Sequence, residues 1–273
     1  MNLNNPLLLI AIHQPGLFVM IAAMLGCMVR WQIVPSDRKR TEMALVFVLL
    51  TTILGWAGEA IARSLSSVRP GKLDLFVYQF DHVFHDPSFV LGRMLYGHRW
   101  IQPILQIAYN SIPTAVAAAI AYHYYGRHRG EDIRLIVTAF ALNIGLSPIV
   151  YSIVPVCGPI YAFQSFPFDP GPVHASLMHI NAAPNGFPSI HFSTALLIVW
   201  ALRRSPTGVV LATINALLMV GATLGSGEHY LLDLLASFPY AALMCSLSRY
   251  LIERWDARKM PFEEGPQAEC MES

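Results

Sequence analysis

His229 and Asp233 are the two residues whose types and spacing most directly suggest chemistry, since they lie four positions apart at the start of an apolar run. Residues four apart share one face of a helix, so the carboxylate can accept a hydrogen bond from one imidazole nitrogen. The other nitrogen is then free to attack an electrophile, as an activated nucleophile or general base does. A hydrogen-bonded pair that only anchors a helix end has the same spacing, so a second feature is needed.

That second feature is the segment 185–191, Asn-Gly-Phe-Pro-Ser-Ile-His, which reads as a loop entering a helix. Gly186 gives the backbone room, and Pro188 suits a first helical turn. Free N–H groups at such a helix start bind anions. Ser189 adds a hydroxyl, although a helix cap explains this residue more simply than catalysis does. His191 lies one turn into the helix and could donate a proton to a leaving oxygen.

The elements that carry these residues are membrane helices. Hydrophobic residues make up 55% of the 273, charged residues 13%, and the mean hydropathy is +0.48, which is too apolar for an ordinary soluble domain. The net charge of +1 argues against a nucleic-acid partner. We expect an all-α integral membrane protein with about seven transmembrane helices, at residues 7–29, 43–62, 103–125, 134–155, 188–202, 207–225 and 230–251.

Orientation follows from the positive residues, which gather after the first, third, fifth and last helices. By the positive-inside rule these ends face the cytoplasm, and both histidine motifs then lie on the outer side. The helix that begins near residue 188 spans only roughly 22 to 24 Å of a hydrocarbon core about 30 Å thick. His191 should therefore lie near the depth of the headgroup phosphates. The residues counted are Arg30, Arg38, Lys39, Arg40, Arg127, Arg129, Arg134, Arg203, Arg204, Arg249, Arg254, Arg258 and Lys259.

Residues 1–253 are predicted to form a single transmembrane catalytic domain, because the helices have no other core against which to pack. Two long loops, 63–102 and 156–187, lie on the predicted outer side. The first mixes aromatic and charged residues, so it forms either an amphipathic helix in the interface or an ordered cap over the bundle. Residues 254–273 are predicted to be a flexible cytoplasmic tail.

Together the two histidine motifs resemble those of the type 2 phosphatidic acid phosphatase superfamily. Its second motif is Pro-Ser-x-His, matched by Pro188, Ser189 and His191, and its third ends in His-x-x-x-Asp, matched by His229 and Asp233. The Ser and Arg that open the third motif are replaced here by Ala222 and Thr223. The first motif, Lys followed by Arg-Pro, is also absent, since Arg69-Pro70 has Ala62 in place of the lysine. The usual phosphate-binding cations are therefore missing.

The combinations Gly-Phe-Pro-Ser-x-His and His-Tyr-x-x-Asp are similar to those of inositol phosphorylceramide synthases, and the latter also to sphingomyelin synthases. This resemblance implies a bundle formed by the last six helices. It also implies His229 as the nucleophile on phosphorus, Asp233 as its orienting partner and His191 as the acid to the leaving alcohol, without a metal or another cofactor. Candidates for binding the phosphate or substrate are Ser189, Gly186, Arg93, Arg99 and Tyr230. The two arginines could equally contact lipid headgroups.

The partners expected from this resemblance are membrane lipids: a phospholipid donor and, for a transferase, a sphingolipid or diacylglycerol acceptor. A hydrolase that releases inorganic phosphate or a phosphorylated headgroup is the enzymatic alternative. Outside enzymes, a lipid transporter could use the same histidines to bind headgroups, and a haem site could use them as axial ligands. The haem alternative leaves Ser189 and Asp233 without a role.

Overall fold

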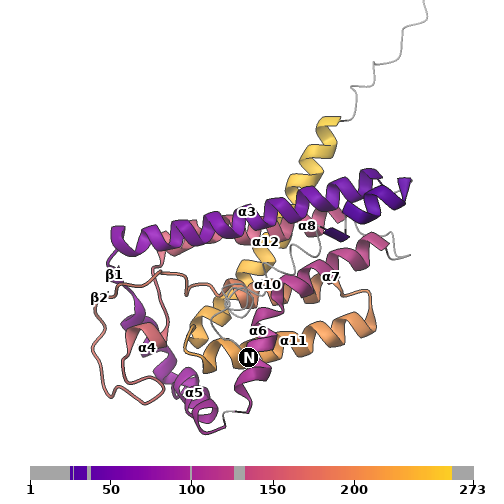
Figure 1. The fold of residues 1–273 in the computed structure, drawn as a ribbon. Coiled ribbons are helices and arrows are strands. Elements are labelled where there is room, and N and C mark those ends of the chain that lie inside the picture. Colours follow the sequence, from indigo (N-terminus) through magenta and orange to yellow (C-terminus); the bar gives the residue numbers. More distant parts are fainter. Residues whose placement is uncertain (1–24, 27, 36–37, 99, 126–132, 260–273) are drawn as a thin grey trace, which may run out of the picture.

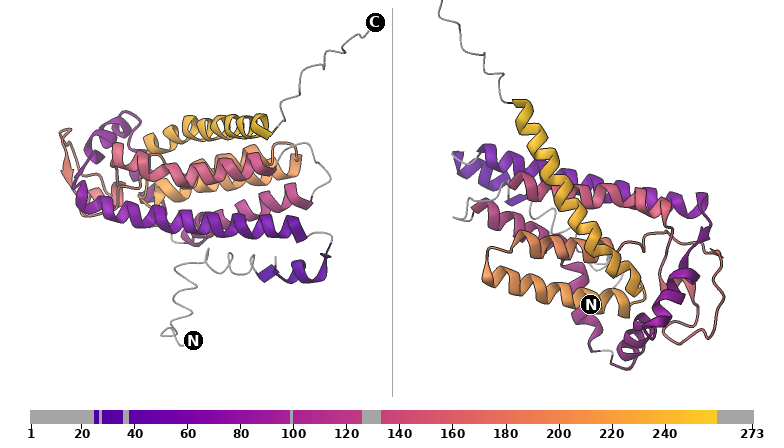
Figure 2. Two further views of the ribbon diagram at one scale, coloured as in Figure 1. Left: turned by 90° about the horizontal axis from the view of Figure 1, so that it is seen from above. Right: turned by 180° about the vertical axis from the view of Figure 1, so that it is seen from behind.

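A computed structural model describes residues 25–26, 28–35, 38–98, 100–125 and 133–259, which form an almost entirely helical molecule (Figure 1). The long helices lie side by side, and the short elements gather at one end of the bundle (Figure 2). In chain order the elements are α3 (Arg38–Val68), β1 (Gly71–Lys72), α4 (Asp74–Val83), α5 (Pro87–Gly97), α6 (Gln102–Asn110), α7 (Ile112–Tyr125), α8 (Ile133–Ile153), α9 (Pro159–Ala162), β2 (Met178–His179), α10 (Ile190–Ala201), α11 (Pro206–Gly225) and α12 (Leu231–Lys259).

Three of these helices, α8, α11 and α12, are long and apolar enough to cross a membrane. Helices α6 and α7 make a fourth candidate span if taken together, with a bend of 48° between them. Helix α10 is apolar but only 12 residues long. The predicted all-α membrane bundle is thus confirmed, while the predicted number of spans is larger than the number that meets this test. Most of the predicted span 7–29 lies outside the described residues.

Helix α10 lies in the centre of the bundle, packed against α7, α8, α11 and α12. Its apolar side chains, including Phe192, Leu197 and Ile198, are almost completely buried in the main core. One polar group joins three helices there, because Asn143 of α8 donates to Thr194 Oγ1 at 2.9 Å and accepts from Ser193 Oγ at 2.8 Å. The Asn143 carbonyl accepts from the Tyr240 hydroxyl of α12 at 2.9 Å. Satisfied buried polar groups of this kind fix how helices pack.

The predicted loop 63–102 is mostly helical and lies over one end of the bundle. Helix α3 runs on to Val68, six residues beyond its predicted end, and α4 and α5 follow. Helix α4 contacts α9 and α12, and α5 contacts α11, so this segment caps the bundle (Figure 1). Strand β1 pairs antiparallel with β2 from the second long loop, with Gly71 opposite His179. This strand pairing joins the two long loops.

At the carboxyl end, α12 continues to Lys259, so the first six residues of the predicted tail belong to a helix. Residues 260–273 lie outside the described residues.

Candidate active site

His229 lies in the turn between α11 and α12, and the backbone determines which of its nitrogens carries the proton. Its Nδ1 is 2.9 Å from the carbonyl oxygen of Gly186. A carbonyl oxygen can only accept a hydrogen bond, so Nδ1 must donate. In the neutral ring, the lone pair is then on Nε2. The His229 residue is 4% exposed, which keeps the ring in a nearly dry environment.

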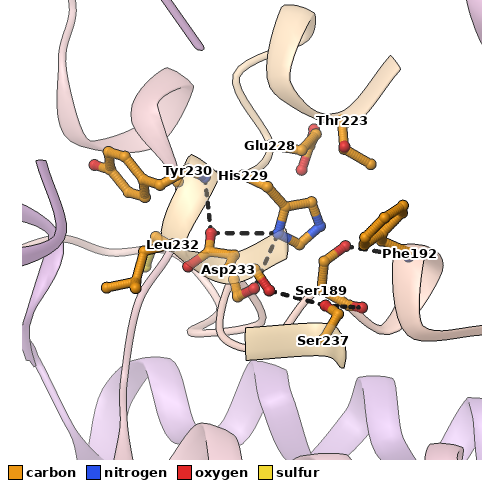
Figure 3. A network of polar contacts seen from close by, with 12 residues as sticks. Ser189, Phe192, Thr223, Glu228, His229, Tyr230, Leu232, Asp233 and Ser237 are labelled. Atoms are coloured by element: carbon orange, nitrogen blue, oxygen red, sulfur yellow. Dashed lines mark hydrogen bonds and ion pairs between the residues drawn. The ribbon is translucent and has the colours of Figure 1, made fainter. Parts of the chain in front are cut away.

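Asp233 stands close to the same nitrogen, with Oδ2 3.5 Å from His229 Nδ1 (Figure 3). That oxygen also accepts from the main-chain N–H of Tyr230 at 2.8 Å. An acidic side chain in the first helical turn that bonds back to an N–H before the helix stabilises the helix start. The predicted pairing across four positions is present as an ion-pair contact, and the shortest hydrogen bond of the imidazole goes instead to Gly186. Asp233 thus combines the two roles that the sequence left open, because it anchors the helix end and lies beside the imidazole.

Gly186 lies where two loop segments approach each other closely. Its N–H donates to the carbonyl of Val156 at 2.7 Å. A Cβ atom at this position would lie 2.8 Å from that same carbonyl oxygen. Only glycine fits without a shift, and a shift would move the carbonyl that binds His229. Gly186 therefore contributes to the site through its main chain.

Ser189 is the N-cap of α10, and its Oγ accepts from the N–H of Phe192 at 3.3 Å. The serine is fully buried, and its carbonyl accepts from Ser237 Oγ of α12 at 3.0 Å. Its own N–H donates to the carbonyl of Asp233 at 3.3 Å. These bonds tie the start of α10 to the first turns of α12. Pro188 precedes the cap, so the prediction that it occupies the first helical turn was wrong by two positions.

His191 is supported by Tyr109, a residue outside the predicted site. The Tyr109 hydroxyl is 3.2 Å from His191 Nδ1, and the two rings stack with centroids 4.1 Å apart. Tyr109 is the second-last residue of α6, just before the bend at Ser111. Ser189, two residues before His191, is hydrogen-bonded to Asp233, four residues after His229. The two sequence motifs therefore meet, and Nε2 of His191 is the nitrogen that Tyr109 leaves available.

Among the described residues, a cavity of about 430 Å³ is lined by neighbours of the two histidines and by neither histidine itself. Tyr109 lines it on one side and Glu228, the neighbour of His229, on another. Both carboxylate oxygens of Glu228 are 3.1 Å from the hydroxyl of Tyr161. Burial, together with the charge of Glu228, raises the pKa of Tyr161 to about 12, so this hydroxyl remains a donor. The described lining consists of Gly92, Leu95, Tyr96, Gln102, Leu105, Gln106, Tyr109, Ile160, Phe166, Pro167, Ala222, Gly225, Ser226 and Glu228.

Two buried aspartates of α4 bind the turn that carries His229 and the loop beside it. Asp81 accepts from the N–H groups of Leu231 and Leu232, at 2.7 and 3.2 Å, at the start of α12. Asp74 accepts from Gly158 at 2.8 Å and from the Tyr230 hydroxyl at 3.2 Å. Desolvation dominates over these hydrogen bonds and raises the pKa of Asp81 to about 7 and that of Asp74 to about 6. The sequence offered only a weak signal for them, namely acidic residues in a loop that mixes aromatic and charged residues.

The other residues predicted to bind phosphate or substrate are Arg93, Arg99 and Tyr230. Arg93 is exposed and its Nη1 lies 3.5 Å from the carbonyl of Pro167. Arg99 lies outside the described residues. The Tyr230 ring points away from the His229 imidazole and is completely buried (Figure 3). Thr223, which replaces the arginine of the third motif, donates its hydroxyl back to the carbonyl of Met219 at 2.8 Å and so cannot replace that cation.

Across the described ranges, no group of three or more His, Cys, Asp and Glu side chains is arranged to hold a metal ion. The described residues of the site include two imidazoles, and Nε2 of His229 carries the lone pair of its neutral ring.

Comparison with known proteins agrees with these motifs. No curated protein matches the chain. Among solved structures, the chain is similar to a transmembrane PAP2-type phosphatidylglycerolphosphate phosphatase from Bacillus subtilis, with 16% identity, coverage of 80% of this chain and 96% of that one, and a TM-score of 0.31. The sequence profile of the PAP2 superfamily matches residues 76–247, which include both histidine motifs and the α4 aspartate Asp81. The chain therefore belongs to the PAP2, or type 2 phosphatidic acid phosphatase, superfamily.

Proposed function

We propose that this protein is a lipid phosphotransferase that transfers the phosphorylated headgroup of a phospholipid through a phosphohistidine intermediate. The observation that carries this proposal is the hydrogen bond from His229 Nδ1 to Gly186, which leaves a lone pair on Nε2. A nucleophile held in one tautomer by a fixed acceptor attacks without first reorganising.

In the first step His229 Nε2 attacks phosphorus, an N–P bond forms and the P–O bond to the leaving alcohol breaks. Protonated His191 gives its proton to the departing oxygen. The Tyr109 hydroxyl suits both states of His191, because it accepts from Nδ1–H of the imidazolium and donates to Nδ1 of the neutral ring. As His229 becomes cationic, the nearby Asp233 carboxylate stabilises the charge.

In the second step neutral His191 takes the proton of an acceptor hydroxyl, whose oxygen attacks phosphorus as the N–P bond breaks. An alcohol acceptor such as a ceramide or diacylglycerol makes the reaction a transfer, and water makes it a hydrolysis. Main-chain N–H groups supply part of the stabilisation of the phosphoryl oxygens. Neither step requires a metal ion.

Charge favours a phosphodiester donor. The described lining of the cavity includes no Lys or Arg, and Thr223 stands where relatives carry a cation. A phosphomonoester dianion needs more neutralisation than a phosphodiester monoanion. The lower charge of a phosphodiester therefore favours headgroup transfer, the reaction of inositol phosphorylceramide synthases. Release of inorganic phosphate from a phosphomonoester is less favoured. We place the reaction at the outer leaflet, following the charge of the predicted cytoplasmic loops.

Purified protein in lipid, with EDTA present, would be incubated with phospholipids labelled in the headgroup and with ceramide or diacylglycerol. Product chromatography should show transfer of the headgroup by the wild type and none by His229→Ala. Release of water-soluble phosphate or headgroup alone would make the enzyme a hydrolase. Absence of both products with every donor would contradict the enzymatic proposal and favour lipid binding or transport.

A further inference from the structure

Ser88, in the first turn of α5, donates a hydrogen bond to the main chain of His229. Its Oγ lies 3.0 Å from the His229 carbonyl oxygen, and the two residues are 141 positions apart. Ser88 is completely buried and His229 is 4% exposed, so water hardly competes for this bond. Serine hydroxyls in helices commonly bond to a carbonyl one turn earlier, as Ser237 does with Asp233. The hydroxyl of Ser88 instead reaches out of its own helix.

The bond from Ser88 is one of three that hold His229. The His229 N–H donates to the carbonyl of Thr223 at 3.2 Å, and the ring Nδ1 donates to the carbonyl of Gly186 at 2.9 Å. The three partners come from three segments of the chain: α5, α11 and the loop before α10. Together these bonds fix the peptide groups on both sides of the His229 Cα and the ring that it carries.

Helix α5 is itself held in a defined place. It lies so close to the end of α11 that a Cβ atom at Gly225 would be 2.4 Å from Leu95 Cδ1. The turn before α5 contains two non-glycine residues with positive φ, His85 at 60° and Asp86 at 53°. Such backbone is uncommon outside glycine and persists where the surrounding structure favours it. This turn brings the first turn of α5 against the turn that carries His229.

On the basis of the proposed function, we propose that Ser88 is a positioning residue for the nucleophile. Its hydrogen bond fixes the peptide group between His229 and Tyr230 and thereby keeps Nδ1 of the ring against the Gly186 carbonyl. Without the hydroxyl, the His229 carbonyl is a buried acceptor that has lost its donor, and the peptide group rotates toward another. The ring then loses its alignment with Gly186, and the proton can occupy Nε2, the nitrogen that must attack.

The first test compares turnover in two variants that each lose one buried hydroxyl. Ser88→Ala should lower kcat for a labelled donor roughly tenfold or more, because a small misplacement of a reacting group is costly in the transition state. The KM should stay within about twofold, since binding of the donor does not depend on this bond. Ser248→Ala is the matched control: Ser248 is equally buried, but its Oγ bonds to the carbonyl of Cys245 in its own helix at 2.8 Å. This variant should keep the wild-type kcat.

The second test reads the ring directly and needs no turnover. Nitrogen-15 NMR of protein labelled in histidine distinguishes a protonated from an unprotonated ring nitrogen, and the signals of His229 are those missing from His229→Ala. At a pH where the ring is neutral, the wild type and Ser248→Ala should show the Nδ1–H tautomer alone. Ser88→Ala should show a mixture of the two tautomers. A general loss of stability would not change the tautomer of the folded protein.

Where the wild type turns over a donor, the inference requires both changes in Ser88→Ala, and either change without the other overturns it. If the wild type turns over no donor, the proposed function fails and the tautomer alone decides: a mixture in Ser88→Ala supports the positioning role, and the unchanged Nδ1–H form refutes it. Should Ser88→Ala not fold, Ser88→Cys takes its place, because the thiol is a weaker donor of nearly the same size. Both effects are then expected in smaller degree, and the absence of both refutes the role.

Discussion

His229 donates its Nδ1 proton to the main-chain oxygen of Gly186, a residue 43 positions earlier in the chain, across 2.9 Å. The Asp233 carboxylate is farther from the same atom, at 3.5 Å. The backbone therefore selects the tautomer, and the carboxylate contributes charge. Because the two groups act differently, we expect substitutions of Gly186 and of Asp233 to have different effects.

Gly186→Ala should impair both activity and folding, because the new methyl group would lie 2.8 Å from the Val156 carbonyl oxygen and force the loop to shift. Overpacking of this kind typically destabilises a protein by about 1–3 kcal/mol. Turnover of labelled donor and thermal unfolding of the purified protein would measure the two effects. Gly55→Ala on α3 is the matched control, since nothing lies within 4 Å of its added Cβ. Equal activity in both variants would show that the Gly186 carbonyl is not needed.

Asp233→Asn should lower kcat by roughly 10²-fold or more while leaving measurable activity, because stabilisation of the cationic ring is lost but Gly186 still holds the tautomer. His229→Ala should abolish phosphoryl transfer. Single-turnover assays with labelled donor, stopped in alkali to preserve phosphohistidine, would compare the variants. If Asp233→Asn kept the wild-type kcat, the carboxylate would have only a structural role, through its hydrogen bond with the Tyr230 N–H.

Tyr109→Phe keeps the ring that stacks on His191 and removes the hydroxyl 3.2 Å from its Nδ1. If Tyr109 positions His191 as the acid, kcat/KM should fall by about tenfold, the loss expected for a hydrogen bond to a charged group. The loss should be smaller for a donor with a nitrophenol leaving group, which departs without full protonation. An equal loss for both leaving groups would instead indicate a packing defect, which thermal unfolding would reveal.

Stability should fall as the pH rises through the range in which Asp81 and Asp74 ionise in the folded protein. Their pKa values are raised from the ordinary 3.8 to about 7 and about 6 by burial. The folded state thus binds more protons than the unfolded state between about pH 4 and pH 7, and the free energy of unfolding decreases with pH over that window. Below it, both states are protonated and this contribution is complete.

Asp81→Asn should flatten the decrease in melting temperature between pH 5 and pH 8, because one of the two titrating groups is removed. Glu253→Gln supplies a control for the loss of a carboxylate as such. The slope is the relevant readout, since loss of an acceptor for Leu231 or Leu232 lowers stability at every pH. A slope identical to that of the wild type would mean that Asp81 does not titrate in this range.

The sequence was sufficient for those parts of the site that depend on local spacing. His229 and Asp233 lie close together as their spacing of four suggests, although His229 precedes the first residue of α12 and the predicted shared helix face was wrong. Ser189 caps α10 as its position before an apolar run suggests. The all-α bundle follows from composition in the same way. Tyr109 was not predicted as part of the site. Its contact with His191 joins residues 82 positions apart, and no local sequence pattern encodes such a contact.

The phosphate-binding role of Arg93 has no local pattern behind it either, and it stays a prediction. Arg93 was a candidate because of its predicted side of the membrane, but a flexible side chain on an exposed helix face is free to turn toward any acceptor. It lies against the Pro167 carbonyl, outside the cavity lining. Glu228 lies beside His229 in the sequence, yet its place in the lining of a cavity depends on the turn formed by Ser226 and Gly227.

The Asn143 network bears on how the chain assembles within lipid. Apolar helix faces gain little from one register over another there, because lipid tails are as apolar as the side chains. A slip of α10 by one residue would rotate Ser193 and Thr194 by about 100° away from Asn143 and leave buried polar groups unpaired. That penalty discriminates between registers. Because His191 lies two positions before Ser193, selection of the helix register also sets the position of the His191 imidazole.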